Sequence, residues 1–259
     1  MTSSRHGGRS SSEPHPHPIP GDGLVPRGPA DVSPTTTRVE LRTGAAPRLE
    51  QITLVTAHCT VVAVDIAGFN AHHRNNINQV RVRHGMYRAM QEAFDHAGVP
   101  WESCYREDRG DGVLLLAHAD VPKALFVDHL PSALVRAVVR HNRLHPRAEK
   151  LRLRLALHAG EINYDEHGVT GSAINHTFRL LEAWATKEAL ANSSAVLAIV
   201  GSAWFFEEVI RHSERSRAKS YRPIDIMHKE TATKAWIRLL SGKFATHPDS
   251  APHVPRQGL

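Results

Sequence analysis

The sequence is poor in cysteine and in uninterrupted apolar runs. Its 259 residues include two cysteines, Cys59 and Cys104, which are too few for a disulfide framework or a four-thiolate zinc site. No window approaches the roughly 20 apolar residues that a membrane-spanning helix needs, and the N-terminus lacks the short apolar core of a secretory signal. We therefore expect no membrane partner and a cytoplasmic location, where both thiols stay reduced.

Common metal-binding and DNA-reading motifs are also absent. The 19 histidines contain no HExxH or similar ligand spacing. The net charge of +6 comes from scattered basic residues with loose clusters at 81–88 and 211–222, and no DNA-reading motif accompanies them. We interpret this charge as a solvated surface that also suits a polyphosphate, and we expect no nucleic-acid partner. A nucleic-acid-binding protein with salt-sensitive affinity is the alternative that the charge leaves open.

Two tails of low complexity flank the part of the chain that can fold. Residues 1–50 are rich in Ser, Pro, Gly, His and Thr and have no apolar periodicity. Such a segment cannot bury enough apolar surface to offset its chain entropy, so we predict a disordered tail. Residues 241–259 have a similar composition and the same prediction. We assign residues 51–240 to one domain.

Between the tails, short apolar runs alternate with segments of helical periodicity. Buried or half-buried strands are predicted at residues 60–64, 113–117, 151–158 and 195–200, with a closing hairpin of 222–227 and 235–239. Helices are predicted from the spacing of apolar residues in 86–97, 130–138, 173–185 and 202–212. The alternation indicates an α/β (α+β) sandwich, in which a mixed sheet carries helices mainly on one face.

Two aspartates stand at the ends of predicted strands. Asp65 directly follows the apolar run VVAV, and Asp111 lies in residues 107–112 (EDRGDG), just before the next strand. A buried carboxylate needs a partner because an unpaired buried charge is costly. Acids at the ends of neighbouring strands can share divalent cations, which prefer oxygen ligands. Taken alone, an aspartate at the end of a strand more often has a purely structural role.

A second polar pair lies on the helix predicted over residues 173–185. Asn175 and Arg179 are four residues apart and so share one helix face. An amide and a guanidinium that point together suit a ribose oxygen and a developing phosphate charge. The alternative is a surface asparagine beside a salt-bridged arginine.

These segments together resemble the catalytic domain of class III adenylyl/guanylyl (nucleotidyl) cyclases. Residues 64–69 (VDIAGF) are similar to the first metal motif of that family, and residues 107–111 (EDRGD) to its second metal hairpin. Residues 154–160 (RLALHAG) and 171–180 (GSAINHTFRL) resemble its R-x-G-x-H-x-G strand and its Asn/Arg helix. The four motifs keep the family's order and spacing over roughly 180 residues. The resemblance implies a ferredoxin-like, palm-type mixed sheet, which is the class III cyclase fold.

The resemblance also implies roles for individual residues. Asp65, the backbone of Ile66 and Asp111 would bind two Mg²⁺ or Mn²⁺ ions, which activate the ribose 3′-hydroxyl and hold the triphosphate. Asn175 would orient the ribose, and Arg179 would stabilise the pentavalent phosphate of the transition state. We expect Asp65→Ala to abolish metal-dependent turnover while leaving the fold largely intact.

The remaining implied contacts concern the triphosphate and the base. Lys229 is the candidate for the triphosphate, and Phe69 is a further substrate-binding candidate. Glu107 occupies a base-reading position at which guanylyl cyclases carry glutamate, and its carboxylate can accept from the N1–H and N2–H of guanine. Gly168 occupies the second base-pocket position and has no side chain to read a base. GTP is therefore favoured, while ATP and a pyrimidine triphosphate stay open.

The expected enzyme is a nucleotidyl cyclase that forms a 3′,5′-cyclic monophosphate for intracellular signalling. The resemblance implies a head-to-tail homodimer with composite sites, in which the metal aspartates face the Asn/Arg pair of the other copy. Two alternatives to a GTP cyclase remain: a CTP or UTP cyclase of anti-phage defence, and a catalytically silent, cyclase-like module that binds nucleotide and regulates.

Overall fold

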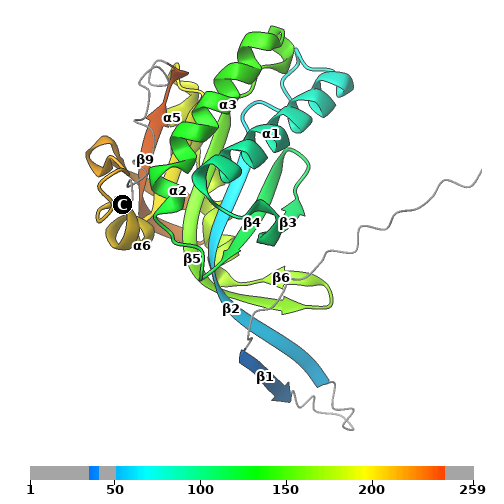
Figure 1. Cartoon of the computed structure of the whole chain (residues 1–259), viewed down its shortest axis with the longest axis vertical. Coiled ribbons are helices and arrows are strands. Elements are labelled where there is room, and N and C mark those ends of the chain that lie inside the picture. Colours follow the sequence, from blue (N-terminus) through cyan, green and yellow to red (C-terminus); the bar gives the residue numbers. More distant parts are fainter. Residues whose placement is uncertain (1–34, 41–50, 243–259) are drawn as a thin grey trace, which may run out of the picture.

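A computed structural model describes residues 35–40 and 51–242, with side chains from residue 55 onward (Figure 1). The strands are β1 (Thr35–Glu40), β2 (Gln51–Ile66), β3 (Tyr105–Asp108), β4 (Gly112–His118), β5 (Leu153–Asp165), β6 (Gly168–Thr170), β7 (Leu197–Ser202), β8 (Arg222–His228) and β9 (Thr231–Leu240). The α-helices are α1 (Asn76–Ala97), α2 (Leu125–Asp128), α3 (Leu130–Leu144), α4 (Ser172–Glu182), α5 (Trp184–Ala191) and α6 (Ala203–Phe205). The short 3₁₀ helices are η1 (Trp101–Ser103), η2 (Arg147–Glu149) and η4 (Ala218–Ser220), and η3 (Phe206–Ile210) is a π-helix.

The strands form one mixed sheet in the order β3-β4-β2-β5-β7-β9-β8, with β1 added to β2 and β6 added to β5. The β5–β7 pair is parallel and its neighbours are antiparallel. The predicted closing hairpin is confirmed as β8–β9, where Ile224 pairs with Ala235. β2 and β5 lie at the centre of the sheet, so they are the strands best placed to carry buried groups.

Helices cover the sheet on both faces, with the two longest on the same one. α1 and α3 lie side by side across this face (Figure 1) and pack on a core that includes Val62, Val64 and Ile66 of β2. α4 and α5 cover the opposite face, where Leu180 of α4 and Ala63 of β2 belong to the same core cluster. Alternation along β2 explains the division, because successive side chains point to opposite faces. The predicted sandwich, with its mixed sheet and helices mainly on one face, is confirmed.

The N-terminal part differs from the prediction. β2 begins at Gln51, nine residues before the predicted strand, and its first part pairs antiparallel with β1, from Thr35 opposite Thr56 to Glu40 opposite Gln51. Residues 35–40 (TTTRVE) therefore do not follow the prediction of an unstructured tail, because their β-branched residues favour an extended strand beside a free edge. Residues 1–34, 41–50 and 243–259 lie outside the described part of the chain, so the rest of the tail prediction stays untested.

Two helices also differ from their predicted bounds. α1 begins ten residues before the apolar stripe that predicted it, because Asn75 and Asn78 form a reciprocal capping box, and it ends at Gly98 as expected. The helix predicted over residues 173–185 is broken at Ala183, whose ψ of 138° is extended. The break separates α4, which carries Asn175 and Arg179, from α5. Across the described ranges, no helix has the length and apolar character to cross a membrane.

Candidate functional site

Asp65 and Asp111 meet at one end of the β2–β4 pair. Asp65 lies opposite Gly112 in the antiparallel register, and the amide of Ile66 donates to the carbonyl of Asp111 over 2.9 Å. Burial raises the pKa of Asp65, and the negative charge of Asp111 raises it further. The structure thus brings the three predicted metal-binding positions together at this sheet end. The Asp65 side chain points to the sheet face that α4 and α5 cover, because its neighbours Val64 and Ile66 point to the opposite one.

Arg154 neutralises Asp65 within the same chain. The two residues are directly opposite each other on β2 and β5. Nε and Nη2 of Arg154 donate to the two carboxylate oxygens over 2.8 and 2.7 Å, and the side chains are 12% and 13% exposed. This bidentate pair opposes the rise in the pKa of Asp65 that burial causes. The expectation that Asp65→Ala leaves the fold largely intact conflicts with this geometry, because the change would leave the buried guanidinium of Arg154 without a charge partner.

The donor set at this end of the sheet is compatible with a hard divalent cation. Asp111 is half-buried, and a carboxylate pair with a nearby backbone carbonyl offers only oxygen ligands. The described part of the chain has no group of three or more His, Cys, Asp or Glu that could hold a metal ion. Mg²⁺ needs no such protein cage, since it is commonly held by one or two carboxylates, substrate phosphates and waters. The residues fit the predicted group, and metal binding stays a prediction.

α4 lies unusually close to β5 and carries the second polar group. A Cβ at Gly160 would stand only 2.8 Å from the Cβ of Ala173, so this approach requires glycine. Asn175 is exposed. Arg179 donates from Nη1 to Oγ1 of Thr231 over 2.8 Å and from Nη2 to Glu230 over 2.6 Å. Glu230 follows Lys229 in the β8–β9 turn and Thr231 begins β9, so the predicted triphosphate lysine lies near the arginine.

The two predicted base positions also come together. Tyr105 of β3 donates its hydroxyl to Oε2 of Glu107 over 3.2 Å. The same hydroxyl oxygen would lie 3.6 Å from a Cβ at Gly168. Arg109 binds Oε1 of Glu107 over 3.0 Å and lies over the ring of Phe178 on α4, at 5.2 Å from the ring centroid. Glu107 and Gly168 are therefore linked to the helix of Asn175 and Arg179.

Solved structures were found that share this arrangement of strands and helices. An adenylate/guanylate cyclase/hydrolase from Silicibacter pomeroyi is 17% identical, covers 72% of this chain and 98% of its own, and has a TM-score of 0.50. A bacterial light-regulated adenylyl cyclase is 11% identical at a TM-score of 0.50, with 70% of this chain matching 51% of that one. The guanylyl cyclase Cya2 is 16% identical, with coverages of 70% and 90% and a TM-score of 0.49.

The chain has the class III nucleotidyl cyclase fold. The predicted fold is thereby confirmed. No family model and no curated protein matches the sequence, so the likeness rests on the arrangement of the backbone.

Within this cyclase fold, the carboxylates and the α4 group have no direct polar interaction in the described part of the chain. Among the described side chains, no hydrogen bond or ion pair joins Asp65 or Asp111 to Asn175 or Arg179. Phe69 packs against the core beneath α1, on the face opposite α4. Its substrate contact stays a prediction, as do the roles of the other site residues.

A histidine cluster lies beside the α4 group. Nδ1 of His158 is 2.8 Å from Oγ of Ser202, and the rings of His158 and His176 are 4.8 Å apart. Burial, together with the charges of His176 and His58, lowers the pKa of His158 to about 4. Ser202 accepts from the amide of Phe205, so its hydroxyl is available to donate to a neutral imidazole. We assign this cluster a structural role.

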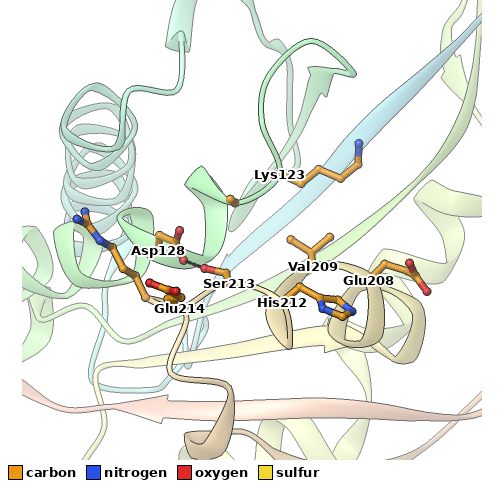
Figure 2. Close-up of a pocket in the computed structure, with 9 residues that line it drawn as sticks. Lys123, Asp128, Glu208, Val209, His212, Ser213 and Glu214 are labelled. Atoms are coloured by element: carbon orange, nitrogen blue, oxygen red, sulfur yellow. Dashed lines mark hydrogen bonds between the residues drawn. The ribbon is translucent and has the colours of Figure 1, made fainter.

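A separate open groove of about 590 Å³ lies between α2 and the residues around η3 (Figure 2). Lys123, Asp128, Glu208 and His212 are among its lining residues, and Ser213 donates to Asp128 there. No predicted site residue lines this groove. It therefore takes no part in the proposed chemistry of the cyclase fold.

Sequence reasoning missed several groups that contact the predicted ones. Arg154 is in the third motif but had no assigned partner, and Tyr105 received no role. Asp108 was also missed: it accepts from Arg83 and from the hydroxyl of Tyr87, and so ties the β3–β4 hairpin to α1. Strand register and helix docking create these contacts, so only the alternation along β2, β3 and β5 could have suggested them.

Proposed function

We propose that this chain is a metal-dependent nucleotidyl cyclase, which converts a nucleoside triphosphate, GTP in preference, to its 3′,5′-cyclic monophosphate and pyrophosphate for intracellular signalling. The observation that carries the proposal is the adjacency of Asp65 and Asp111 at one sheet end, with the Asp65 side chain on the sheet face that α4, the helix of Asn175 and Arg179, covers. The cyclase fold supports it, as do the cyclase names of the similar structures.

The reaction needs positive charge at the phosphates and an oriented ribose. The 3′-oxygen attacks the α-phosphorus, the bond to the β-phosphate oxygen breaks, and the hydroxyl proton and pyrophosphate leave. When bound through Asp65 and Asp111, two Mg²⁺ or Mn²⁺ ions would favour loss of that proton and offset the leaving charge. Asn175 is exposed on α4 and available to a ribose oxygen.

Arg179 is suited to a phosphate that gains charge. Its side chain is 31% exposed and its partner Glu230 is 77% exposed. Such an exposed ion pair contributes only about 0–1 kcal/mol, so a triphosphate can compete for the guanidinium. The exposed Lys229 lies in the same turn and adds a point charge for the triphosphate.

Among the described side chains, no hydrogen bond or ion pair joins the two carboxylates to Asn175 or Arg179 within one chain, which agrees with composite sites. We infer a head-to-tail homodimer in which Asp65 and Asp111 of one copy face Asn175 and Arg179 of the other. This assembly is testable by mixing two inactive variants, Asp111→Asn and Arg179→Ala. Activity restored in the mixture supports shared sites. Verified heterodimers without recovered activity would exclude them.

The decisive experiment is a product assay on the full chain. The purified protein is incubated with each of the four nucleoside triphosphates and Mn²⁺ or Mg²⁺, and cyclic products are identified by mass spectrometry. Asp111→Asn is the control, because it removes a predicted ligand without breaking the Asp65–Arg154 pair. We expect cyclic GMP from the wild-type chain and none from the variant.

Two other outcomes identify the alternatives. Cyclic CMP or cyclic UMP as the main product would indicate a pyrimidine cyclase of the anti-phage type. Nucleotide binding without any cyclic product would indicate a silent regulatory module. Product formation that is equal in the wild-type chain and in Asp111→Asn would refute the proposed site.

A further inference from the structure

We infer that the hydroxyl of Tyr105 acts as the second base-reading group of this chain, in the place of the side chain that Gly168 lacks. The inference rests on the proposed function, since it concerns the substrate of the same site. It starts from a contact that the sequence does not reveal. The hydroxyl oxygen of Tyr105 lies 3.6 Å from the position of a Cβ at Gly168 and 3.2 Å from Glu107.

A side chain at position 168 is disfavoured by the backbone. Gly168 has a φ of 128°, a conformation that residues other than glycine rarely adopt. The phenol of Tyr105 reaches the same space from β3. Its ring stands edge-on to that of Tyr164, with the centroids 6.1 Å apart and the planes at 85°. The hydroxyl is thus held in the base region by packing.

The hydrogen-bond direction decides what this hydroxyl can read. Burial and the Glu107 carboxylate raise the pKa of Tyr105, so the phenol stays protonated. Its proton is directed to Oε2 of Glu107. The phenol oxygen then has only lone pairs left for a ligand, and it acts as an acceptor.

Glu107 is constrained in the same way. Arg109 binds its Oε1 over 3.0 Å, and Tyr105 binds its Oε2. Each carboxylate oxygen has two acceptor positions, so one on each oxygen remains free. The side chain is 34% exposed and open to a ligand. Tyr105 and Glu107 together therefore present adjacent acceptors and no free donor.

Adjacent acceptors select a base edge with adjacent donors. Guanine offers N1–H and N2–H side by side, whereas the Watson–Crick edges of adenine and cytosine pair one amine with an acceptor nitrogen. If adenine or cytosine occupied the site, its acceptor nitrogen would face the oxygen of Tyr105 and find no hydrogen-bond donor. This lowers the affinity for these bases relative to guanine. The pair Tyr105–Glu107 thus favours guanine although position 168 contributes no side chain.

The test compares Tyr105→Phe with the matched control Tyr164→Phe. The first change removes the hydroxyl and keeps the ring. The second removes the hydroxyl of the neighbouring tyrosine, whose contact is Sγ of Cys59 at 3.5 Å. GTP and ATP compete in one sample with Mn²⁺, and the ratio of cyclic products is measured. This ratio does not depend on the fraction of folded enzyme.

We expect Tyr105→Phe to lower the GTP-over-ATP ratio roughly threefold to tenfold, as one lost neutral hydrogen bond allows, and Tyr164→Phe to leave it unchanged. Tyr105→His, whose ring nitrogen can accept, is expected to lie between the wild type and Tyr105→Phe. An unchanged ratio in Tyr105→Phe, or an equal fall in Tyr164→Phe, overturns the inference.

Binding separates the inference from the proposed function. Calorimetry with GTP and ATP in the presence of Ca²⁺ gives the ratio of the two dissociation constants, which requires no turnover. A wild-type chain that prefers GTP in binding but forms no cyclic product refutes the cyclase activity, and the variants still test Tyr105. A wild-type chain that binds GTP no better than ATP refutes the guanine-reading role, whether or not it cyclises either nucleotide.

Discussion

The ion pair between Asp65 and Arg154 predicts that Asp65→Ala destabilises the whole domain. Both side chains are nearly buried, at 13% and 12% exposed, and they are joined by two hydrogen bonds. Removing one partner of a buried pair costs about 3–5 kcal/mol, because the other charge stays buried without compensation. The free energy of unfolding of a typical domain is about 5–15 kcal/mol, so this loss is a large part of the total.

Urea unfolding at pH 7, followed by circular dichroism, measures this loss. Asp111→Ala is the matched control: Asp111 is half-buried, and among the described residues its side chain makes no hydrogen bond or ion pair. We expect its effect to stay within about 0.5 kcal/mol. The double variant Asp65→Ala/Arg154→Leu is expected to recover much of the lost stability, since an apolar pair can replace a buried ion pair.

A cost below about 1 kcal/mol for Asp65→Ala would refute this reasoning, as would a double variant less stable than the single one. The outcome also decides how activity data are interpreted. Loss of turnover in Asp65→Ala would combine misfolding with any loss of metal. Asp111 is therefore the better position at which to test the proposed cations.

Three further predictions concern the hairpin, the pH and the metal. Asp108→Asn weakens the contacts from Arg83 and Tyr87, so the unfolding free energy should fall by about 1 kcal/mol and kcat should fall with it. An unchanged urea midpoint would show that these contacts do not stabilise the β3–β4 hairpin against α1. Because the pKa of His158 falls from 6.5 to about 4 on folding, its stabilising effect is complete above pH 6.5 and is lost as the pH falls toward 4. The loss of unfolding free energy between pH 6.5 and pH 4 should be smaller in His158→Gln by about 1–2 kcal/mol, a value reduced because the imidazole is partly exposed. A loss equal to that of the wild type would show that His158 does not cause this pH dependence. Chelation with EDTA should abolish cyclisation and added Mn²⁺ should restore it, as mass spectrometry of the product would report; full activity in EDTA would exclude the metal requirement.

The sequence was sufficient for the strand-end carboxylates and the general fold. Asp65 and Asp111 each adjoin a short apolar run that is typical of a buried strand, so their adjacency was expected from neighbouring strands. The α4 pair followed from helical spacing alone, since Asn175 and Arg179 are four residues apart. Local patterns of this kind depend on no long-range pairing, and for that reason they were predictable.

The features that were missed depend on long-range contacts. Arg154 is 89 residues from Asp65, and only the β2–β5 register brings them together. The break at Ala183 has neither glycine nor proline to mark it. There, the buried hydroxyl of Thr186 donates to the carbonyl of Leu180 over 2.8 Å, and the packing of α5 overrides the local preference for a continuous helix.

The two hydrogen bonds that hold Arg179 lower the entropic cost of binding a ligand at this side chain. A free arginine side chain loses up to about 2 kcal/mol of rotamer entropy when it is fixed. Thr231 and Glu230 already hold the guanidinium from the β8–β9 turn, so most of that loss has occurred during folding. A nucleotide that replaces Glu230 would therefore bind an Arg179 side chain that is already ordered, and only the β8–β9 turn would need to adjust.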